Sequence, residues 1–318
     1  MRVLVTGGAG FIGANLCRSL VRRGAQVVVL DDLSTGRRDN LAGLDVDLRV
    51  ASVLDEAAVA DAFAGVDSVV HLAAVPSVGR SLLDPRRSHD INVTGTMQVL
   101  DAARAVAAHV VIASSSSVYG SNPQLPKAET MTCSPVSPYA AGKLAAESYA
   151  LAYQNCFGLR CSAFRFFNVF GPLQTPGHAY AAVIPAFAWA ALRGEPLVVF
   201  GDGEQSRDFT FVDSLVAVLG DCVWRGISAE APVNLAFGTR TSLNEVIVML
   251  SALLGRRLDV EHRPARIGDV RHSQASVAVL RGMFPRIEPL PLELALCRTV
   301  EWMEPFAREA QVVAGTRG

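Results

Sequence analysis

Lysine is nearly absent from this sequence, although basic residues as a group are not. Among 29 Lys+Arg residues only Lys127 and Lys143 are lysine, and 30 Asp+Glu residues bring the formal net charge to −1. Without an excess of positive charge, the chain lacks the electrostatic attraction that holds nucleic acid or an anionic membrane surface. We therefore expect neither as a partner. Because arginine is the usual basic residue of this chain, a lysine indicates a position that needs a compact ammonium group rather than a guanidinium.

The sequence also lacks a membrane-length hydrophobic run, a targeting segment and paired cysteines. Its longest uncharged apolar stretch, residues 179–192, contains Pro185 and is too short to cross a membrane. The chain enters an apolar run directly after Met1-Arg2, with no leader pattern before it. The six cysteines form no C-x-x-C pair, which is typical of buried thiols in a reducing compartment. The six histidines are scattered, so we expect no metal site. From the missing membrane segment, leader and paired cysteines we expect a soluble, cytoplasmic protein.

The apolar content indicates a large folded core rather than a small module. Half of the 318 residues are hydrophobic and only 19% are charged, which excludes a disordered chain and a disulfide mini-protein. Helix-length segments separate most of the predicted strands, and this alternation is typical of an α/β fold with a doubly wound parallel sheet, a Rossmann domain. The predicted strands are Val3–Thr6, Val27–Leu30, Leu48–Ala51, Ser68–Leu72, Val110–Ser114 and Cys161–Phe166.

Glycine and proline break the pattern after Phe166, which predicts a second, smaller unit. We therefore expect a Rossmann domain over residues 1–167 and a C-terminal α/β substrate domain over residues 168–318, with some segments of the latter returning to the sheet.

A glycine pattern follows the first predicted strand. Gly7, Gly10 and Gly13 are spaced three residues apart between that strand and an apolar-periodic helix. Such glycines permit a tight turn and let a dinucleotide diphosphate approach the helix N-terminus. Asp31-Asp32 ends the second strand, where a carboxylate meets the adenosine ribose. Two carboxylates would repel a 2′-phosphate, so the pattern predicts NAD rather than NADP. The alternatives are two surface acids in a turn, or NADP binding helped by the nearby Arg37 and Arg38.

Tyr139 and Lys143 form a second pattern. Ser137-Pro138 is typical of a helix start, so the two residues lie one turn apart on one helix face. An ammonium beside a phenol stabilises the phenolate, so this pair predicts a tyrosine base with a lowered pKa. The alternative is a pair of surface residues on a helix.

Together these motifs resemble a known family. TGGAGFIG, Y-x-x-x-K and ASSSSVYG are similar to the extended short-chain dehydrogenases/reductases, and FFNVFGP, GDGEQSRDF and GDVRHS extend the similarity over nearly the whole chain. Within that family the chain resembles nucleotide-sugar 4-epimerases, in particular bacterial UDP-N-acetylglucosamine 4-epimerases.

The resemblance implies NAD, a UDP-sugar substrate, a homodimer and a set of site residues. Ser115 and Tyr139 would act on the sugar 4-hydroxyl while hydride passes between sugar C4 and NAD, and Lys143 completes the catalytic set. The cofactor residues implied are Gly7, Gly10, Phe11, Ile12, Gly13, Asp31, Asp32, Ser34, Gly36, Ser52, Val53, Leu72, Ala73, Ala74, Asn92, Ser114, Tyr139, Lys143 and Phe166. The substrate residues implied are Ser77, Ser115, Ser116, Asn168, Ala182, Val183, Phe200, Arg207, Arg266, Asp269 and Ser273.

The same resemblance indicates which reaction and substrate to expect within the family, and it leaves alternative functions open. Related dehydratases and decarboxylases have acids where this chain has Ser116 and Ser117, so their chemistry is disfavoured. A small residue at Ser273 would admit a 2-acetamido group, which predicts UDP-N-acetylglucosamine and its galacto epimer, with UDP-glucose and UDP-galactose also accepted. UDP-glucuronate stays open, although Trp189 stands where uronate epimerases have arginine. Arg80 or Arg193 would have to replace that carboxylate partner. Ser52 replaces an aspartate that usually contacts adenine. A catalytically silent NAD-binding regulator is the rival from another class.

Overall fold

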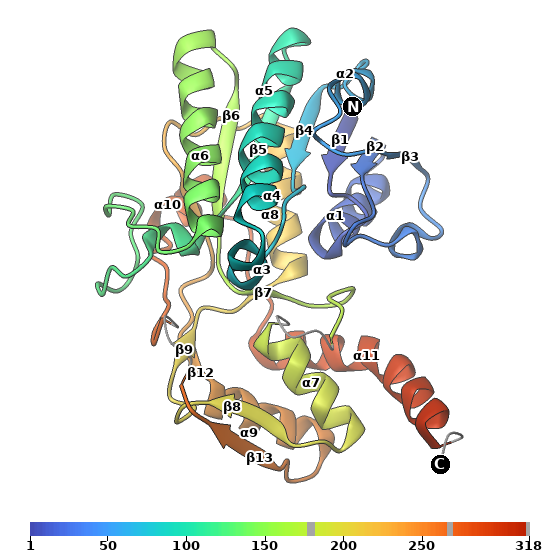
Figure 1. Cartoon of the computed structure of the whole chain (residues 1–318), viewed down its shortest axis with the longest axis vertical. Coiled ribbons are helices and arrows are strands. Elements are labelled where there is room, and N and C mark those ends of the chain that lie inside the picture. Colours follow the sequence, from blue (N-terminus) through green and yellow to red (C-terminus); the bar gives the residue numbers. More distant parts are fainter. Residues whose placement is uncertain (177–181, 266–269, 316–318) are drawn as a thin grey trace.

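A parallel sheet forms the centre of the chain (Figure 1). The computed structural model describes residues 1–176, 182–265 and 270–315, and within these ranges the sheet has seven strands in the order β11-β6-β5-β4-β1-β2-β3. The strands are β1 Arg2–Thr6, β2 Gln26–Asp31, β3 Val46–Val50, β4 Ser68–His71, β5 His109–Ser115, β6 Cys161–Phe166 and β11 Val233–Leu235. This is the predicted doubly wound fold, with β11 as a strand that the sequence did not reveal.

Helices cover both faces of the sheet because successive strand residues point to opposite sides. Val3 and Val5 belong to one buried cluster, with α1 (Phe11–Arg22) and α8 (Val212–Arg225), whereas Leu4 belongs to the other. The second cluster includes residues of α2 (Glu56–Ala62), α5 (Gly95–Ala105) and α6 (Pro138–Phe157). Strands buried on both faces read as continuous apolar runs, which is why most of them were recognisable.

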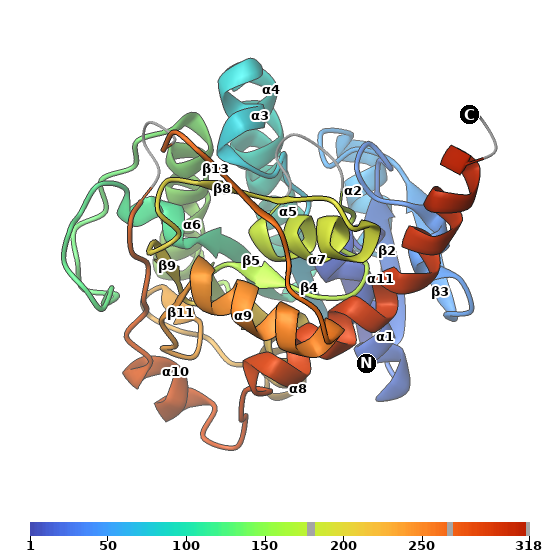
Figure 2. The same cartoon turned by 90° about the horizontal axis from the view of Figure 1, so that it is seen from below.

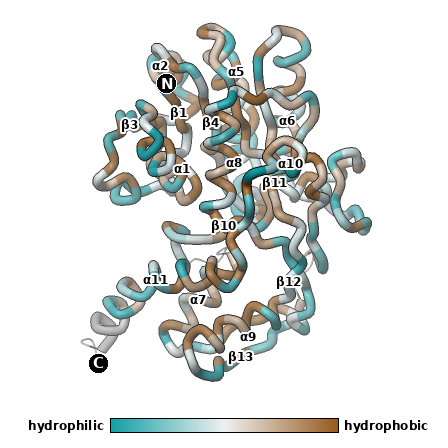
Figure 3. Tube along the Cα trace, turned by 180° about the vertical axis from the view of Figure 1, so that it is seen from behind, coloured by the Kyte–Doolittle hydropathy of each residue, from teal (hydrophilic) through white to brown (hydrophobic). Residues whose placement is uncertain are grey.

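A smaller layer covers the end of the sheet to which the parallel strands run (Figures 1 and 2). It contains α7 (Val183–Arg193), α9 (Leu243–Leu254) and α11 (Leu292–Gly315), and Figure 3 shows α7 and α9 as largely hydrophobic tubes. Its short strand pairs are β7 Val169–Phe170 with β10 Thr210–Phe211, β8 Leu197–Phe200 with β13 Val260–Arg263, and β9 Ser206–Arg207 with β12 Thr241–Ser242. Helix α10 (Ala278–Met283) lies against β11.

The second half of the sequence therefore contributes to the sheet as well as to the smaller layer. Strand β11 pairs with β6, and α8 packs against α1, β4 and β5. None of the helices within the described residues combines the length and apolar character needed to cross a membrane. All six cysteines lie in the described part and are free, but Cys156 is exposed in the last turn of α6, so the expectation of buried thiols is wrong for it.

Short helices connect the sheet to the surroundings of the site. They follow the carboxyl ends of β2, β4 and β5, where loops gather in this architecture. They are η1 Arg38–Leu41, α3 Val78–Leu83, α4 Pro85–His89, η2 Asp90–Thr94 and η3 Ser116–Tyr119.

Helix α6 begins where the sequence predicts. The Ser137 hydroxyl accepts a hydrogen bond from the Ala140 N–H at 3.2 Å, Pro138 occupies the first turn, and Gly158 ends the helix in a left-handed conformation. A serine cap of this kind contributes about 1 kcal/mol. The cap fixes the register of the helix, and thereby the height of Tyr139 and Lys143 above the sheet.

His71 at the end of β4 is a buried structural histidine. Its side chain lies between Thr6 Oγ1, 2.7 Å from Nδ1, and Thr96 Oγ1, 3.0 Å from Nε2. The Thr96 hydroxyl donates its proton to the Asn92 carbonyl, so it accepts from Nε2–H, and the Thr6 hydroxyl donates to Nδ1. The neutral ring is thus satisfied at both nitrogens. Burial lowers the pKa of His71 to about 3.

This histidine predicts acid sensitivity. The folded-state pKa of His71 lies below its unfolded value. Its contribution to the free energy of unfolding is therefore fully present above about pH 6.5 and decreases as the pH falls, because the unfolded state takes up a proton that the folded state excludes. Between pH 7 and pH 5 the loss from this group is about 2 kcal/mol. We expect His71→Gln to weaken the pH dependence measured by urea unfolding at the two pH values. A slope equal to that of the unmodified chain would contradict the assignment.

Candidate active site

A cavity of about 700 Å³ opens at the carboxyl ends of the central strands. Its walls come from the turn after β1, the ends of β2, β5 and β6, the segment after β4, and residues around Asn168. Strand order reverses between β1 and β4, and this switch point is where doubly wound sheets bind ligands.

The glycine turn forms one wall of the cavity. Gly7 has a φ of +69°, and a Cβ there would lie 2.7 Å from the Ala73 nitrogen; a Cβ at Gly13 would lie 2.6 Å from the Gly8 Cα. Helix α1 begins beside Gly10 without a side-chain cap, so its first amides are available to an anion. These close approaches fit a dinucleotide whose diphosphate rests on the turn.

Two carboxylates stand at the end of β2, and the structure gives them different surroundings. Asp31 is 7% exposed and accepts hydrogen bonds from the Ala9 N–H at 2.9 Å and the Leu33 N–H at 2.8 Å. Burial raises the pKa of Asp31. Asp32 is exposed and accepts from the Ser34 N–H at 2.9 Å. Gly36 does not line the cavity, but a Cβ there would lie 2.9 Å from both Asp31 oxygens, so this glycine permits the Asp31 arrangement.

The hydroxyl, phenol and ammonium groups predicted from the sequence meet in the same cavity. Ser115 ends β5, while Tyr139 and Lys143 lie one turn apart on α6. Burial raises the pKa of Tyr139, and its hydrogen bond with Ser115 lowers it. The Lys143 Nζ donates to the Ala113 carbonyl at 2.8 Å, and burial lowers the pKa of Lys143 to about 8.

This arrangement corrects one expectation. The sequence predicts that Lys143 lowers the pKa of Tyr139, but in the structure the lowering contact comes from Ser115 and burial outweighs it. The reason is geometric, because the Lys143 ammonium is directed at a backbone carbonyl of β5.

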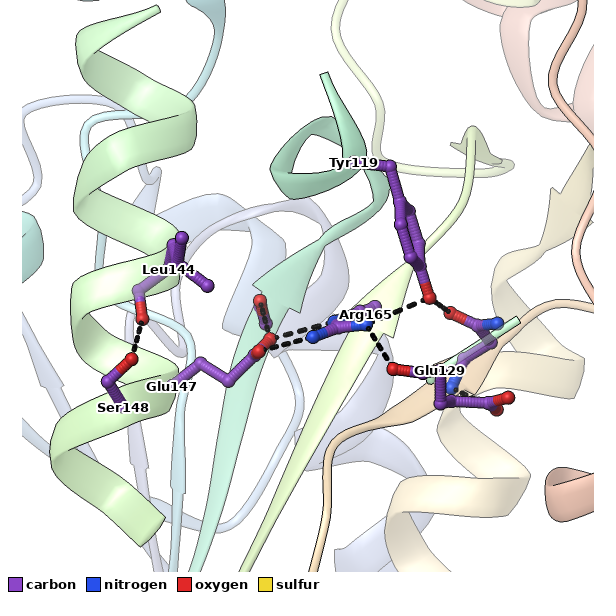
Figure 4. Close-up of polar contacts among 8 residues, drawn as sticks. Tyr119, Glu129, Leu144, Glu147, Ser148 and Arg165 are labelled. Atoms are coloured by element: carbon purple, nitrogen blue, oxygen red, sulfur yellow. Dashed lines mark hydrogen bonds and ion pairs between the residues drawn. The ribbon is translucent and has the colours of Figure 1, made fainter. Parts of the chain in front are cut away.

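Behind these groups lies a buried ion pair that sequence reasoning missed (Figure 4). Glu147 and Arg165 are joined by two hydrogen bonds, of 3.0 Å from Nε and 2.5 Å from Nη2. Burial alone would lower the pKa of Arg165, but Glu147 outweighs it, and the guanidinium stays charged. The signal was present in the spacing: Glu147 lies four residues after Lys143 and eight after Tyr139, on the same helix face.

Asn92, expected beside the nicotinamide, does not line the cavity. Its side chain accepts from the Val75 N–H at 2.8 Å and donates to the Val75 carbonyl at 3.3 Å. Asn92 is therefore a support for Val75, which does line the cavity. The other cofactor residues named from the sequence, apart from Gly36, all line it.

The expected substrate residues divide into three groups. Ser77, Ser115, Asn168 and Ala182 line the cavity. Arg266 and Asp269 lie outside the described residues. The remaining ones lie outside the cavity lining; they are Ser116, Val183, Phe200, Arg207 and Ser273.

A hydrogen-bonded cluster holds the segments around this substrate end. The buried Asp208 accepts from the Gly238 N–H at 3.1 Å, the Thr239 hydroxyl at 3.1 Å and the Ala275 N–H at 3.0 Å, and its carbonyl accepts from Asn168 Nδ2 at 3.1 Å. Burial raises the pKa of Asp208 to about 6. The cluster thus joins the segment of Asn168 to the segment that follows Ser273.

Further side chains complete the lining without having been proposed for it. In doubly wound folds such sites are built by the loops that follow the parallel strands. The position of these residues in the loops after strand ends was therefore the sequence signal that could have identified them. They include Thr35, Asn40, Val75, Pro76, Arg87, Ile91, Val169, Leu173, Gln174 and Thr175. Arg37, noted from the sequence as a basic neighbour of Asp31-Asp32, and Arg80, noted as a possible partner for a sugar carboxylate, line it too.

Comparison with known proteins agrees with this geometry. Residues 3–220 match the model of the NAD dependent epimerase/dehydratase family. A UDP-glucose 4-epimerase of Mycolicibacterium smegmatis is 37% identical over 95% of this chain and 98% of its own length. The solved structure of a Methanobrevibacter ruminantium UDP-N-acetylglucosamine 4-epimerase in complex with UDP-N-acetylmuramic acid matches with a TM-score of 0.89 and 35% identity, covering 95% of this chain and 97% of that one.

A Thermus thermophilus UDP-glucose 4-epimerase in complex with NAD matches with a TM-score of 0.86 and 33% identity, covering 95% of this chain and 98% of that one. The family model spans more than half of the chain, and these relatives cover nearly all of it. The chain therefore belongs to the NAD-dependent epimerase/dehydratase family of extended short-chain dehydrogenases/reductases, as an NAD-dependent isomerase.

Proposed function

We propose that this isomerase inverts C4 of UDP-hexoses, interconverting UDP-N-acetylglucosamine with UDP-N-acetylgalactosamine and also UDP-glucose with UDP-galactose. The observation that carries the proposal is the meeting of Ser115, Tyr139 and Lys143 in one cavity with the glycine turn. A hydroxyl, a phenol and an ammonium beside a dinucleotide site are the groups that an alcohol–ketone interconversion uses. Epimerases of UDP-glucose and of UDP-N-acetylglucosamine among the relatives support it.

Most of the cofactor residues implied by the family resemblance line the cavity, and we assign the parts of an extended NAD molecule to them. Gly7, Gly10 and Gly13 would hold its diphosphate, Asp31 and Asp32 its adenosine ribose, and Ser52 and Val53 its adenine. The nicotinamide half would lie toward Leu72, Ala73, Ala74, Ser114 and Phe166. When bound, NAD supplies the acceptor for the C4 hydride and returns it.

The protein side chains handle the proton. Tyr139 takes the O4 proton while Ser115 holds the same oxygen by a hydrogen bond, and this leaves a 4-keto sugar. Burial raises the pKa of Tyr139, and the hydrogen bond with Ser115 lowers it. Ser115 therefore stabilises the phenolate form of the base as well as binding the substrate oxygen. Lys143 donates to the Ala113 carbonyl, and its ammonium would also donate to a ligand hydroxyl beside it. After the ketone turns over, Tyr139 returns the proton.

The smaller layer would hold the UDP part. Asn168 faces the cavity and is held by its bond to the Asp208 carbonyl. The Arg207 guanidinium donates to the carbonyls of Ser206 at 3.0 Å and Arg271 at 3.1 Å, so its position is fixed, and we assign it to the diphosphate contacts. Arg266 and Asp269 belong to the same proposal as uridine-ribose and phosphate contacts. Exposed Tyr149 and Phe157 on α6 support a homodimer through the helices of the first domain.

UDP-glucuronate is a second candidate substrate, because one observation favours it. Arg80 lines the cavity beside Ser77, where its guanidinium is available to a sugar carboxylate. Arg193, the other arginine considered, instead binds Glu195 at 2.8 Å and lies over the Trp189 ring. The comparison of hexose and hexuronate substrates therefore belongs in the first assay.

A proton NMR time course of the purified protein with UDP-N-acetylglucosamine and no added NAD tests the proposal. We expect the anomeric signal of the galacto epimer to appear, which would also show that the protein retains its cofactor. If the signal appears only after NAD is added, the proposed reaction is supported, but tight retention of NAD during purification is rejected. Turnover of UDP-glucose or UDP-glucuronate alone would reject the N-acetylated preference. No epimerisation of any of the three would reject the proposed function.

A further inference from the structure

Figure 4 shows the Glu147–Arg165 ion pair. Neither residue lines the cavity, although Glu147 is one helix turn from Lys143, which does. Both side chains are 4% exposed, and their charged groups are 2.5 Å apart at the closest atoms. Replacement of such a pair by well-packed apolar groups is often neutral or stabilising in other proteins. Fold stability alone is therefore a weak explanation for placing two charges here, and the contacts that the pair makes to its neighbours give a better one.

Helix α6 contacts three consecutive residues of β5. Lys143 Nζ donates to the Ala113 carbonyl at 2.8 Å, and the Ser114 hydroxyl donates to Glu147 Oε2 at 2.9 Å. The Ser115 hydroxyl accepts from the Ser117 N–H at 3.2 Å and from the Ser117 hydroxyl at 2.9 Å, and it interacts with the Tyr139 phenol in the cavity. The helix residues in these contacts are spaced four apart, so they form one row facing the strand. The Ser114–Glu147 contact lies one residue from the Ser115 hydroxyl. A shift of Glu147 would therefore move Ser115 relative to the Tyr139 phenol.

Arg165 sets where the Glu147 carboxylate can lie. It is on β6, directly opposite Ser114 in the strand register, and it binds the carboxylate with two parallel hydrogen bonds. A two-point contact fixes orientation as well as distance. Its remaining Nη1 donates to the Tyr119 hydroxyl at 2.9 Å, and Tyr119 donates to Asn234 Oδ1 of β11 at 2.6 Å. The helix η3, which starts directly after Ser115, is thereby fixed at both of its ends.

We propose that Glu147 and Arg165 are positioning residues, which act through Ser114 to hold the Ser115 hydroxyl at the Tyr139 phenol. The inference rests on the proposed 4-epimerase function for its kinetic consequences, but not for its structural ones. The groups near this row include Ser115 and Ala113 from β5 and His71 from β4, which lies near Lys143. Arg165 faces Glu147 and Tyr119, and Cys133 lies near the ion pair.

The test uses Ser114→Ala, Glu147→Gln and a matched control, Tyr153→Phe. Tyr153 is also on α6 and donates to Asp101 of α5 at 2.9 Å, so the control removes a side-chain hydrogen bond of the same helix far from the site. We expect both site variants to lower kcat about tenfold with little change in KM, because a misplaced catalytic group affects the chemical step. Tyr153→Phe should turn over like the unmodified protein.

A second readout does not depend on turnover. Ultraviolet titration of each variant, with and without Tyr139→Phe, isolates the ionisation of the Tyr139 phenol. Since the Ser115 bond lowers the pKa of Tyr139, loosening it should move this ionisation to higher pH in Ser114→Ala and Glu147→Gln, but not in Tyr153→Phe.

The outcomes separate the two proposals. Unchanged kcat and unchanged titration in both site variants would overturn the positioning role, even if thermal unfolding showed that stability had fallen. If Glu147→Gln does not fold, the Tyr139 titration of Ser114→Ala decides, because this variant leaves the ion pair intact, whereas its kcat also depends on the contact of Ser114 with the nicotinamide half. A titration shift in a protein that epimerises no UDP-hexose would support the positioning role while rejecting the proposed function.

Discussion

Replacing Tyr139 with phenylalanine is expected to lower kcat for UDP-hexose epimerisation by about a thousandfold. The variant keeps the ring and its packing but loses the only oxygen placed to take the O4 proton in the proposed mechanism. Cofactor binding should persist, because the glycine turn and the carboxylates of β2 are separate from the phenol. The NMR time course measures the rate, and NAD content of the purified variant shows that the site is still formed.

Tyr149→Phe provides the matched control for this experiment. Tyr149 is on the same helix but is 37% exposed and does not line the cavity, so its removal should leave turnover unchanged. Full activity in Tyr139→Phe would contradict the mechanism. Inactivity of the unmodified protein together with tight NAD binding would favour the rival from another class, a silent NAD-binding regulator.

Replacing Ser273 with tyrosine is expected to abolish UDP-N-acetylglucosamine turnover, by more than about a hundredfold, while UDP-glucose turnover stays within a few-fold. The reason is steric and comes from the family resemblance, in which a tyrosine at this position occupies the space of a 2-acetamido group. Ser273 itself does not line the cavity, so the larger phenol would have to extend toward it. The Ser273 N–H donates to the Ser206 carbonyl at 3.0 Å, and Ala275 is held by Asp208 two residues later. The backbone is therefore tied on both sides and cannot easily retreat from a larger side chain.

The two substrates serve as controls for each other in that variant. A pair of kcat/KM values, measured on one preparation, separates a selective block from general damage. A parallel loss of both activities would show that Ser273 does not act as a gate.

The sequence predicted the architecture wherever burial made a strand uniformly apolar. Five of the six predicted strands match to within one residue at each end, whereas the edge strand β3 begins at Val46, two residues before the predicted Leu48. The residues of β3 are half-buried or exposed, so an apolar-run criterion detects such an edge poorly. Strand β11 was missed because Asn234 interrupts its apolar residues. Only the fold shows that this amide is satisfied by the Tyr119 hydroxyl and the Lys127 carbonyl.

The candidate site was predictable where a motif occupies one short segment. The glycine turn, the β2 carboxylates and the Tyr139–Lys143 spacing are local patterns, and their residues meet in the cavity. Contacts between distant segments were not predictable in this way. The direction of the Tyr139 pKa depends on burial and on Ser115 rather than on Lys143, and Asn92 faces Val75 rather than the cavity. Spacing within a sequence does not contain that information.

The origin of β11 and α8 has a consequence for recombining this chain with its relatives. A crossover at residue 167 would separate β6 from β11 and would remove the helix that packs on α1, β4 and β5. A hybrid made there joins β6 and a sheet face from one parent to the edge strand β11 and the helix α8 from the other. Exchanges of substrate preference between family members should therefore replace the surface segments near Asn168 and Ser273 individually, and leave residues 212–235 with the parent that supplies the sheet.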